Sequence, residues 1–267
     1  MPPNNNGKPA PTAALLIIGN EILSGRTRDV NLSHFAGRLG ARGIQLCECR
    51  VVLDIEEHIV AAVNALRGTY DLVFTTGGIG PTHDDITADA IAKAFSVAIA
   101  EDPRAVAVLE AYYGDEANFT PARRRMTRVP AGAELIDNPI SRAPGFRIGN
   151  VYVMAGVPRI NQAMLESVFD TLPEGTPLHE VAVWSSVVEG QIGETLREIA
   201  LRHTYVEIGS YPIYTQGRFG TTFVLRSENA EALEAAKAEV FAMIRALGIE
   251  PHDGEPAQKT SAGEPGR

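Results

Sequence analysis

The sequence predicts an α/β protein in which an open, mostly parallel sheet is followed by a smaller α/β unit. Short apolar runs, such as ALLIIG at 14–19 and DLVFTT at 71–76, are typical of strands buried in a parallel sheet. The segments between such runs carry apolar residues at helical spacing. Regular alternation of strands and helices is the pattern of a parallel sheet covered by helices.

The first strand, 14–19, leads into a helix that we expect to close at Gly43, with an apolar face of Leu32, Phe35, Ala36 and Leu39. The second strand is predicted at 44–53. Asp54 should start the next helix with Glu57 as its capping-box partner, and this helix should turn four residues inward: Ile55, Ile59, Val63 and Leu66. The third strand, 71–76, leads through a glycine-rich turn into a helix over 85–95.

The rest of the chain continues the alternation around a loop-rich section at 137–146. The first domain should add helices at 105–113, 121–128 and 159–169 and a strand at 151–154. The second should contain strands at 180–188, 206–208 and 222–225 and helices at 191–202 and 228–247. LPEGTP at 172–177 has the composition of a linker, so the predicted domains are 13–172 and 178–250. The start, 1–12, and the end, 251–267, are predicted to be disordered.

The composition is that of a soluble globular protein, with 267 residues, 45% hydrophobic and 21% charged. The net charge of −9 argues against nucleic-acid or anionic-membrane partners. The apolar run at 13–18 is too short for a membrane span. Cys47 and Cys49 are too close in sequence for good disulfide geometry, and reduced thiols fit a cytoplasmic protein.

TTGGIGPTHDD at 75–85 joins a strand to a helix. Its glycines allow backbone N–H groups to converge on an anion, although a tight turn without a ligand is an equally good interpretation. Asp84 and Asp85 follow at once, and a carboxylate repels a phosphate unless a cation lies between them. Mg²⁺ is commonly held by one or two carboxylates together with substrate phosphate, so the pair indicates a metal–phosphate site, with helix capping as the alternative.

GNEILSGRTRDVN at 19–31 places polar side chains just after the first strand. Because ligands gather at the carboxyl ends of the strands of such sheets, we expect this loop to lie next to the glycine turn. Glu21 should face the cleft, and Asn31 should cap the following helix. Arg123–Arg125 is interpreted as a solvated helix face and Arg142 as a weak candidate for phosphate binding. The six histidines show no metal-ligand spacing.

Taken together, the motifs resemble those of the MoaB/Mog family of molybdenum-cofactor biosynthesis proteins. TTGGIGPTHDDIT is similar to the signature of that family, and GNEILSG, Asp54, NP with APGF at 138–146, and GVPR at 156–159 accompany it in order. Within the family they resemble the N-terminal region of CinA, the competence/damage-inducible protein, and the related domain of eukaryotic FAD synthases. The resemblance covers about 13–169 and continues more faintly to 247, where GSYP at 209–212 also fits.

The resemblance implies a three-layer α/β/α domain that binds molybdopterin, or a related ligand with a pyrophosphate, and that forms a homo-oligomer. The implied ligand-binding residues are Gly19, Asn20, Glu21, Ser24, Gly25, Asp29, Asn31, Thr76, Gly77, Gly78, Gly80, Pro81, Thr82, Pro144 and Gly145. Asp54 and Asp85 match the two aspartates that matter for molybdenum insertion in Mog-type proteins.

Members like CinA resemble metal-dependent pyrophosphatases acting on ADP-ribose, and the FAD-synthase domain is similar to an FAD hydrolase. This chain departs from the family pattern in three places. It ends before the C-terminal nicotinamide-nucleotide deamidase domain of CinA could fit, so that activity is not expected. Ser141 and Arg142 stand where Gly-Thr is common, and Ala155 stands where Pro is usual, which puts the substrate in doubt.

The first hypothesis is therefore a metal-dependent hydrolase of a nucleotide diphosphate such as ADP-ribose or FAD. Asp84 and Asp85, with Glu21, would hold Mg²⁺ or a similar ion, the amides of Gly77–Gly80 would bind phosphate, and Asp54 would act as an auxiliary acid or base. Two alternatives stay open: a molybdopterin-binding or transfer protein, and a non-catalytic ligand sensor.

Overall fold

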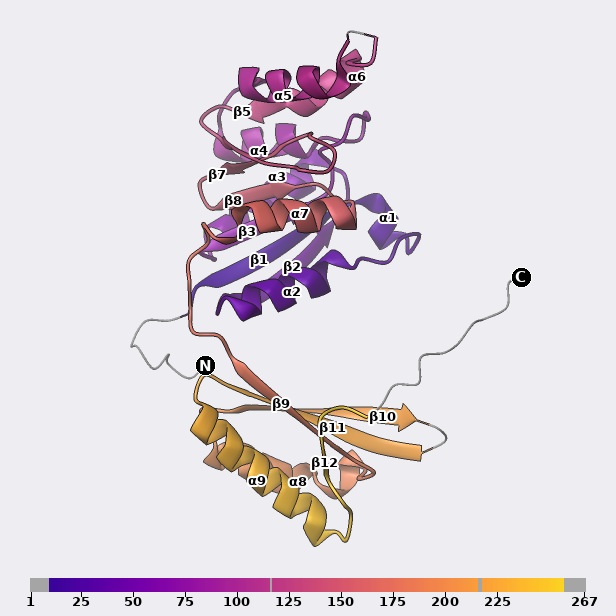
Figure 1. The fold of residues 1–267 in the computed structure, drawn as a ribbon, viewed down its shortest axis with the longest axis vertical. Coiled ribbons are helices and arrows are strands. Elements are labelled where there is room, and N and C mark those ends of the chain that lie inside the picture. The colour runs from indigo at the N-terminus through magenta and orange to yellow at the C-terminus, as the bar shows by residue number, and fades with distance from the viewer. Residues whose placement is uncertain (1–9, 116, 216–217, 257–267) are drawn as a thin grey trace, which may run out of the picture. The chain divides into compact units, whose positions relative to one another are not determined.

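The computed structural model describes residues 10–115, 117–215 and 218–256. The described residues form two compact units, one over 10–175 and one that begins at Thr176 (Figure 1). In these three ranges no helix has both the length and the apolar character needed to cross a bilayer.

The larger unit is built on a sheet of six described strands in the order β2-β1-β3-β8-β7-β6. The strands are β1 (Thr12–Ile18), β2 (Gln45–Val52), β3 (Leu72–Thr76), β6 (Glu134–Ile136), β7 (Gly145–Ile148) and β8 (Val151–Met154). β2, β1, β3 and β8 run parallel, whereas β7 runs in the opposite direction and pairs antiparallel with both β8 and β6. β1 and β3 lie in the middle and are almost wholly apolar and buried, as their sequences predict.

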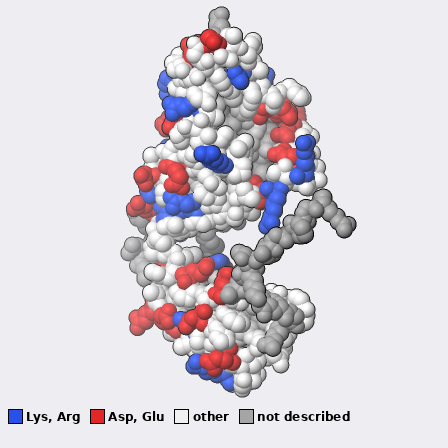
Figure 2. All heavy atoms as spheres, turned by 45° about the vertical axis from the view of Figure 1, so that its right-hand side comes forward, with Lys and Arg blue, Asp and Glu red and all other residues white. Residues whose placement is uncertain are grey.

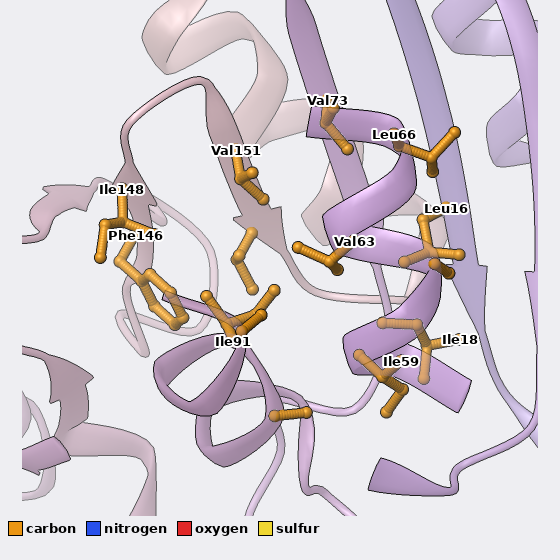
Figure 3. Close-up of a cluster of buried hydrophobic side chains, with 14 of the residues drawn as sticks. Leu16, Ile18, Ile59, Val63, Leu66, Val73, Ile91, Phe146, Ile148 and Val151 are labelled. Carbon is orange, nitrogen blue, oxygen red and sulfur yellow. The ribbon is translucent and has the colours of Figure 1, made fainter. Parts of the chain in front are cut away.

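Helices α3 (Glu56–Arg67) and α4 (Thr87–Phe95) cover one face of this sheet. Ile59 and Val63 of α3 and Ile91 of α4 join Leu16 and Val73 of the sheet in one buried cluster (Figure 3). Each of these side chains is fully buried, and burying one contributes roughly 1.5–3 kcal/mol to folding.

Helices α2 (Asn31–Ala41) and α7 (Pro158–Phe169) cover the opposite face (Figure 1). Phe35 and Leu39 of α2 pack there with Phe74 of β3 and Leu165 of α7. The larger unit therefore has three layers, α/β/α, with a mostly parallel central sheet. This confirms the predicted fold class.

The remaining elements of the larger unit lie around this framework. They are α1 (Asn20–Leu23), β4 (Ile99–Glu101), α5 (Pro103–Tyr113), α6 (Pro121–Arg124), the 3₁₀ helix η1 (Arg125–Thr127) and β5 (Arg128–Pro130). β4 and β5 pair with each other, apart from the main sheet. The predicted helix over 121–128 is thus only one turn of α-helix, because residues 128–130 pair with β4 instead.

The smaller unit is an antiparallel sheet with the order β10-β11-β9-β12 among its described strands. Its elements are β9 (His179–Ser185), η2 (Glu189–Gln191), α8 (Gly193–Arg202), β10 (Glu207–Thr215), β11 (Arg218–Ser227), α9 (Ala230–Ala246) and β12 (His252–Asp253). Val183, Phe223 and Leu225 of the sheet are buried with Ile199 of α8 and Val240 of α9. The predicted small α/β unit is confirmed.

The structure differs from the predicted ends of the ordered chain. Thr12, assigned to the disordered start, begins β1, and residues 252–253, assigned to the disordered end, form β12. Both segments gain backbone hydrogen bonds from a neighbouring strand, which local composition does not reveal. The remaining parts of those predictions, 1–9 and 257–267, lie outside the described residues.

Two predicted helix faces are also wrong in detail. Leu32 and Ile55 are each 39% exposed instead of facing inward, and Ala36 is exposed as well. Asp54 does not cap α3, whose N-terminal cap position is Ile55 without a side-chain hydrogen bond. The carboxylate of Asp54 contacts the end of β1 instead, as described below.

Charged side chains of both signs are mixed over the face shown in Figure 2, where Lys and Arg lie among Asp and Glu. Several of them form ion pairs, such as Arg38 with Glu166 at 2.6 Å and Arg128 with Asp89 at 2.6 Å.

Candidate functional site

Three parallel strands bring their carboxyl ends together in the larger unit. Ile17 near the end of β1 pairs with Thr76 at the end of β3, and Thr76 pairs with Met154 at the end of β8. Residues 76–80, called the glycine turn here, and residues 19–31, called the β1 loop, leave from this edge. The predicted closeness of the two segments is confirmed, because Gly77 lies so near Ile18 that a Cβ added to Gly77 would be 2.1 Å from the Ile18 carbonyl oxygen.

The glycine turn requires glycine at positions 77 and 78 for backbone reasons. Gly77 and Gly78 have φ angles of +103° and +67°, which strain other residues. A Cβ on Gly77 would lie 2.1 Å from the Ile18 carbonyl oxygen, and one on Gly78 would lie 2.1 Å from Oγ1 of Thr87. The Thr87 hydroxyl donates to the Gly77 carbonyl at 3.0 Å and the Thr87 amide to that of Gly78 at 3.0 Å. The first residue of α4 is therefore hydrogen-bonded to the glycine turn.

Three amides of the turn are available to an anion. The Gly77 amide donates to the Met154 carbonyl at 3.1 Å, so the predicted anion contact from Gly77 is wrong. The amides of Gly78, Ile79 and Gly80 have no hydrogen-bond acceptor within the described chain. Successive unbonded N–H groups at a glycine turn are the arrangement that binds phosphate oxygens.

Asp85 lies against this turn. Its Oδ2 accepts from the Thr82 amide at 2.8 Å and from the Thr82 hydroxyl at 2.5 Å, and it would be 2.7 Å from a Cβ on Gly80. α4 begins at Thr87 and has no side-chain cap, so the capping interpretation of Asp84 and Asp85 is wrong. Asp84 is exposed, as are Pro81 and Thr82.

The β1 loop is joined to the end of β2 by a reciprocal contact. The Asn20 amide donates to Oδ2 of Asp54 at 2.8 Å, and the Asp54 amide donates to Oδ1 of Asn20 at 3.3 Å. Glu21 is exposed with its carboxylate over Gly19, and the Ser24 hydroxyl donates to the Glu21 carbonyl. Asp54 thus positions the backbone at the end of β1, a role that its sequence neighbours do not indicate.

The start of α2 also differs from prediction. Asp29, rather than Asn31, supplies the local cap, since its Oδ1 accepts from the Leu32 amide at 2.9 Å. Asn31 is buried and its Nδ2 donates to the Gly156 carbonyl at 3.0 Å, while its Oδ1 is buried without a described partner. Asn161 makes a similar contact, from Nδ2 to the Ala155 carbonyl at 2.9 Å. The side-chain amides of Asn31 and Asn161 thus bind the backbone that follows β8, and this backbone lies close to Gly77.

A pocket opens beside the glycine turn. Gly78, Ile79, Gly80 and Asp85 form one wall, and the others are formed by Ala88, Asp89, Arg125, Met126, Arg128, Val129, Pro144 and Phe146. Among the charged residues of this pocket, sequence reasoning missed Asp89, Arg125 and Arg128, and it interpreted Arg125 as exposed because an Arg-rich helical segment usually faces solvent. The burial of its neighbour Thr127 could not be read from the local pattern.

Several predicted residues lie outside this pocket lining, namely Gly19, Asn20, Glu21, Ser24, Gly25, Asp29, Asn31, Asp54, Thr76, Gly77, Pro81, Thr82, Asp84 and Gly145. Gly145 is buried in β7, where a Cβ would meet the Val153 carbonyl at 2.2 Å, so packing accounts for it. Arg142 has a φ of +64° and lies 3.8 Å from Asp137 in an exposed ion pair, and it does not line the pocket.

The carboxylates fit one kind of metal site. No cluster of three or more His, Cys, Asp or Glu side chains that could hold a metal occurs in the part of the chain described. Oδ1 of Asp85 stays outside the Thr82 hydrogen bonds, and Asp84 is exposed next to it in the chain. One or two carboxylates of this kind suit Mg²⁺ when phosphate oxygens and water complete its coordination.

The fold and this strand-end site define a class of proteins. Residues 14–174 match the family described as "Probable molybdopterin binding domain". This match covers more than half of the chain, so the chain belongs to that family. Residues 177–253 match a second family, described as "FAD synthase, middle domain".

Individual relatives narrow this class. A "CinA-like protein" of Desulfosudis oleivorans is 38% identical over 58% of this chain and 39% of its own length. A protein of Archaeoglobus fulgidus is 32% identical over 74% of this chain and 84% of its own length. A "Probable FAD synthase" of Caenorhabditis briggsae is 29% identical over 89% of this chain and 49% of its own length. The chain thus spans less than half the length of this CinA-like relative and about half that of the FAD-synthase relative.

A solved structure agrees with these relatives. The protein CinA of Thermoplasma acidophilum, described as having unknown function, superimposes with a TM-score of 0.57 and 34% identity. The match covers 61% of this chain and 98% of that chain. The resemblance to the MoaB/Mog and CinA proteins inferred from the motifs is therefore confirmed.

Proposed function

We propose that this chain binds the pyrophosphate group of a nucleotide such as ADP-ribose or FAD at the glycine turn and hydrolyses it with the help of a divalent metal. The observation that carries the proposal is the position of three unbonded amides, those of Gly78, Ile79 and Gly80, next to the carboxylate of Asp85. Phosphate and carboxylate share a site only when a cation separates them. The carboxylates of Asp84 and Asp85 are the proposed ligands of that cation.

Each residue has a distinct role in this proposal. The three amides bind phosphate oxygens, and the Thr82 hydrogen bonds fix the direction of the Asp85 carboxylate. A bound divalent ion would neutralise phosphate charge and favour the ionised form of an attacking water. Glu21 is a further candidate ligand from the β1 loop. Asp54, positioned by the Asn20 amide, is the candidate auxiliary acid or base.

The second candidate function is molybdopterin binding or transfer. It is favoured by the family match over 14–174, whose description names that ligand. The match of 177–253 to the FAD synthase middle domain favours a nucleotide ligand instead, since it adds a second unit that relatives called FAD synthases share. A ligand sensor without catalysis would use the same amides and no metal.

We propose further that the protein is a homo-oligomer of the cytoplasm with a small-molecule nucleotide or pterin ligand. Cys47 and Cys49 are free thiols, and burial raises the pKa of Cys49 to about 11, which keeps it protonated and unreactive at neutral pH. Light scattering of the purified protein measures the oligomeric state directly, and a monomer would contradict that part of the proposal.

The test is to incubate the purified protein with ADP-ribose, FAD and NAD, with and without Mg²⁺ or Co²⁺, and to measure release of AMP. We expect metal-dependent release from ADP-ribose or FAD. Absence of AMP from all three, together with tight binding of molybdopterin, would overturn the hydrolase proposal in favour of the second candidate.

The matched variants are Asp85→Asn and Asp170→Asn. Asn keeps the shape of Asp85 but removes the charge that the cation needs, so turnover should fall by about 100-fold or more. Asp170 is fully exposed at the C-terminal end of α7, so its variant should keep normal activity. Circular dichroism of both variants checks the fold, and near-normal turnover of Asp85→Asn would remove Asp85 from the proposed metal site.

A further inference from the structure

The pocket beside the glycine turn contains a guanidinium group without a carboxylate partner among the described residues. Nη2 of Arg125 is 3.5 Å from the backbone carbonyl of Asp85, a long hydrogen bond, and its Nε is buried with no acceptor. Arg128 lines the same pocket but forms a bidentate pair with Asp89, at 3.0 and 2.6 Å. The two arginines therefore differ: one is neutralised and the other is not.

The neighbours of Arg125 in the chain have partners elsewhere. Arg123 donates to the Asn118 carbonyl and lies over the Tyr113 ring, with its Cζ 4.4 Å from the ring centroid. Arg124 pairs with Glu101 at 2.8 Å. Only Arg125 of this run lines the pocket. Leaving a partly buried cation unpaired is unfavourable, because its desolvation is not compensated.

We propose that Arg125 binds a second phosphate group, beyond the one held by the glycine turn, so that the pocket selects diphosphates over monophosphates. This inference rests on the proposed binding of pyrophosphate at the turn and extends it. Gly78, Ile79, Gly80 and Arg125 line one pocket, so a ligand with two adjacent phosphates would find donors for each phosphate there. The planar guanidinium offers paired N–H donors that match two oxygens of one phosphate.

The acidic residues of the pocket leave this role open. Asp89 is occupied by Arg128, and Oδ2 of Asp85 accepts two hydrogen bonds from Thr82. Neither carboxylate forms an ion pair with Arg125 in the described structure. The charge of the guanidinium is thus not compensated by any carboxylate of the described chain, and an incoming anion would provide that compensation.

The experiment measures binding of inorganic pyrophosphate and orthophosphate by isothermal titration calorimetry, in the presence of Mg²⁺, for three proteins. The wild type should bind pyrophosphate more tightly than orthophosphate. Arg125→Gln should weaken pyrophosphate binding roughly ten- to hundredfold, the loss expected for charge-assisted hydrogen bonds, and should change orthophosphate binding much less. Arg123→Gln removes the same charge outside the pocket and should leave both affinities unchanged.

Three outcomes would overturn the inference: no preference for pyrophosphate in the wild type, equal weakening of both anions in Arg125→Gln, or the same loss in Arg123→Gln. If Arg125→Gln does not fold, Arg125→Lys takes its place, because lysine keeps the charge and loses the paired donors, and pyrophosphate affinity should still fall. The affinities and the release of AMP are measured in separate experiments. A protein that selects pyrophosphate through Arg125 but hydrolyses nothing therefore supports the inference and contradicts the hydrolase proposal. A protein that releases AMP but shows no pyrophosphate preference that depends on Arg125 supports the hydrolase proposal and contradicts the inference.

Discussion

The glycine turn and the β1 loop leave the same edge of the sheet but are held in different ways. The turn is fixed by backbone contacts on three sides: Gly77 to Met154 and Ile18, and both glycines to Thr87. The β1 loop is mostly exposed between its ends, where the Gly19 amide and the Asn20–Asp54 contact hold one end and the Asn31 side chain holds the other. The glycine turn is thus held rigidly and the β1 loop is held more loosely, and both lie at the same edge of the sheet.

This difference suggests a division of labour. A phosphate bound by amides needs those amides in fixed directions before the ligand arrives, since any rearrangement on binding would cost affinity. The carboxylates of the β1 loop do not line the pocket and are not clustered with Asp84 and Asp85, so we expect the loop to move toward a bound ligand if they take part in binding it. We therefore expect substitutions in the glycine turn to destabilise the fold, whereas substitutions in the exposed middle of the β1 loop should affect mainly ligand binding.

The largest expected effect comes from Gly77→Ala. The added Cβ would lie 2.1 Å from the Ile18 carbonyl at a φ of +103°, so the strand end must shift. We expect the free energy of unfolding to fall by about 3 kcal/mol or more. Urea denaturation measures this loss.

The matched control is Gly25→Ala in the β1 loop. Gly25 also has a positive φ, of +73°, but a Cβ at this position would meet nothing within 4 Å. Only the backbone strain remains, so the loss should be about 1 kcal/mol. If both substitutions lowered the free energy of unfolding by the same amount, the glycine turn would be no more tightly packed than the β1 loop.

The sequence was informative wherever the determining contacts are local. Runs such as 14–19 and 71–76 predicted buried strands, and TTGG after a strand predicted the turn at its end. The roles of Asp54 and Asn31 could not be predicted in the same way. Each resembles a helix cap in sequence, but its real partner, Asn20 or Gly156, is brought close only by the pairing of distant strands.

Arg125 shows the same limit in the site itself. In sequence it is one of three arginines after a Pro-initiated helical turn, which indicates a solvated surface. Its burial depends on the chain turning from η1 into β5, which pairs with β4. Nothing within a few residues of Arg125 encodes that pairing, so its place in the pocket became visible only in the fold.

A second prediction compares two asparagines at the same edge. Asn31→Ala removes a part-buried hydrogen bond to the Gly156 carbonyl and leaves space where the buried Asn31 side chain was, which should cost about 1–3 kcal/mol of unfolding free energy. Asn20→Ala removes only one weak, exposed contact, from the Asp54 amide at 3.3 Å, and should cost less than about 1 kcal/mol. Thermal and urea unfolding of both variants test the order, and a reversed order would contradict the assignment of Asn31 as a buried support.

A further small effect concerns Asp102 at the start of α5. Asp102 caps α5 by accepting from the Arg104 amide, and its ion pair with Arg104 holds the pKa of its carboxyl below the ordinary value. A lowered folded-state pKa stabilises the fold above the unfolded-state pKa, and this stability is lost as the pH falls through the folded-state pKa.

Asp102→Ala should therefore lower the free energy of unfolding by about 1 kcal/mol at pH 7, and the difference from wild type should shrink below about pH 4. Unfolding curves from pH 3 to pH 7 measure this trend. A difference that is constant over the whole range would mean that the ionised carboxylate contributes nothing beyond its packing.

The assignment of the glycine turn as the phosphate site is tested most directly by locating a bound pyrophosphate on the protein. Backbone amide spectra of ¹⁵N-labelled protein, recorded while Mg²⁺ and inorganic pyrophosphate are added, report each residue separately. We expect the largest changes at Gly78, Ile79 and Gly80, with little change at Gly77, whose amide is already bonded to Met154. Large changes elsewhere, with the glycine turn unaffected, would contradict the assignment of this turn as the phosphate-binding site.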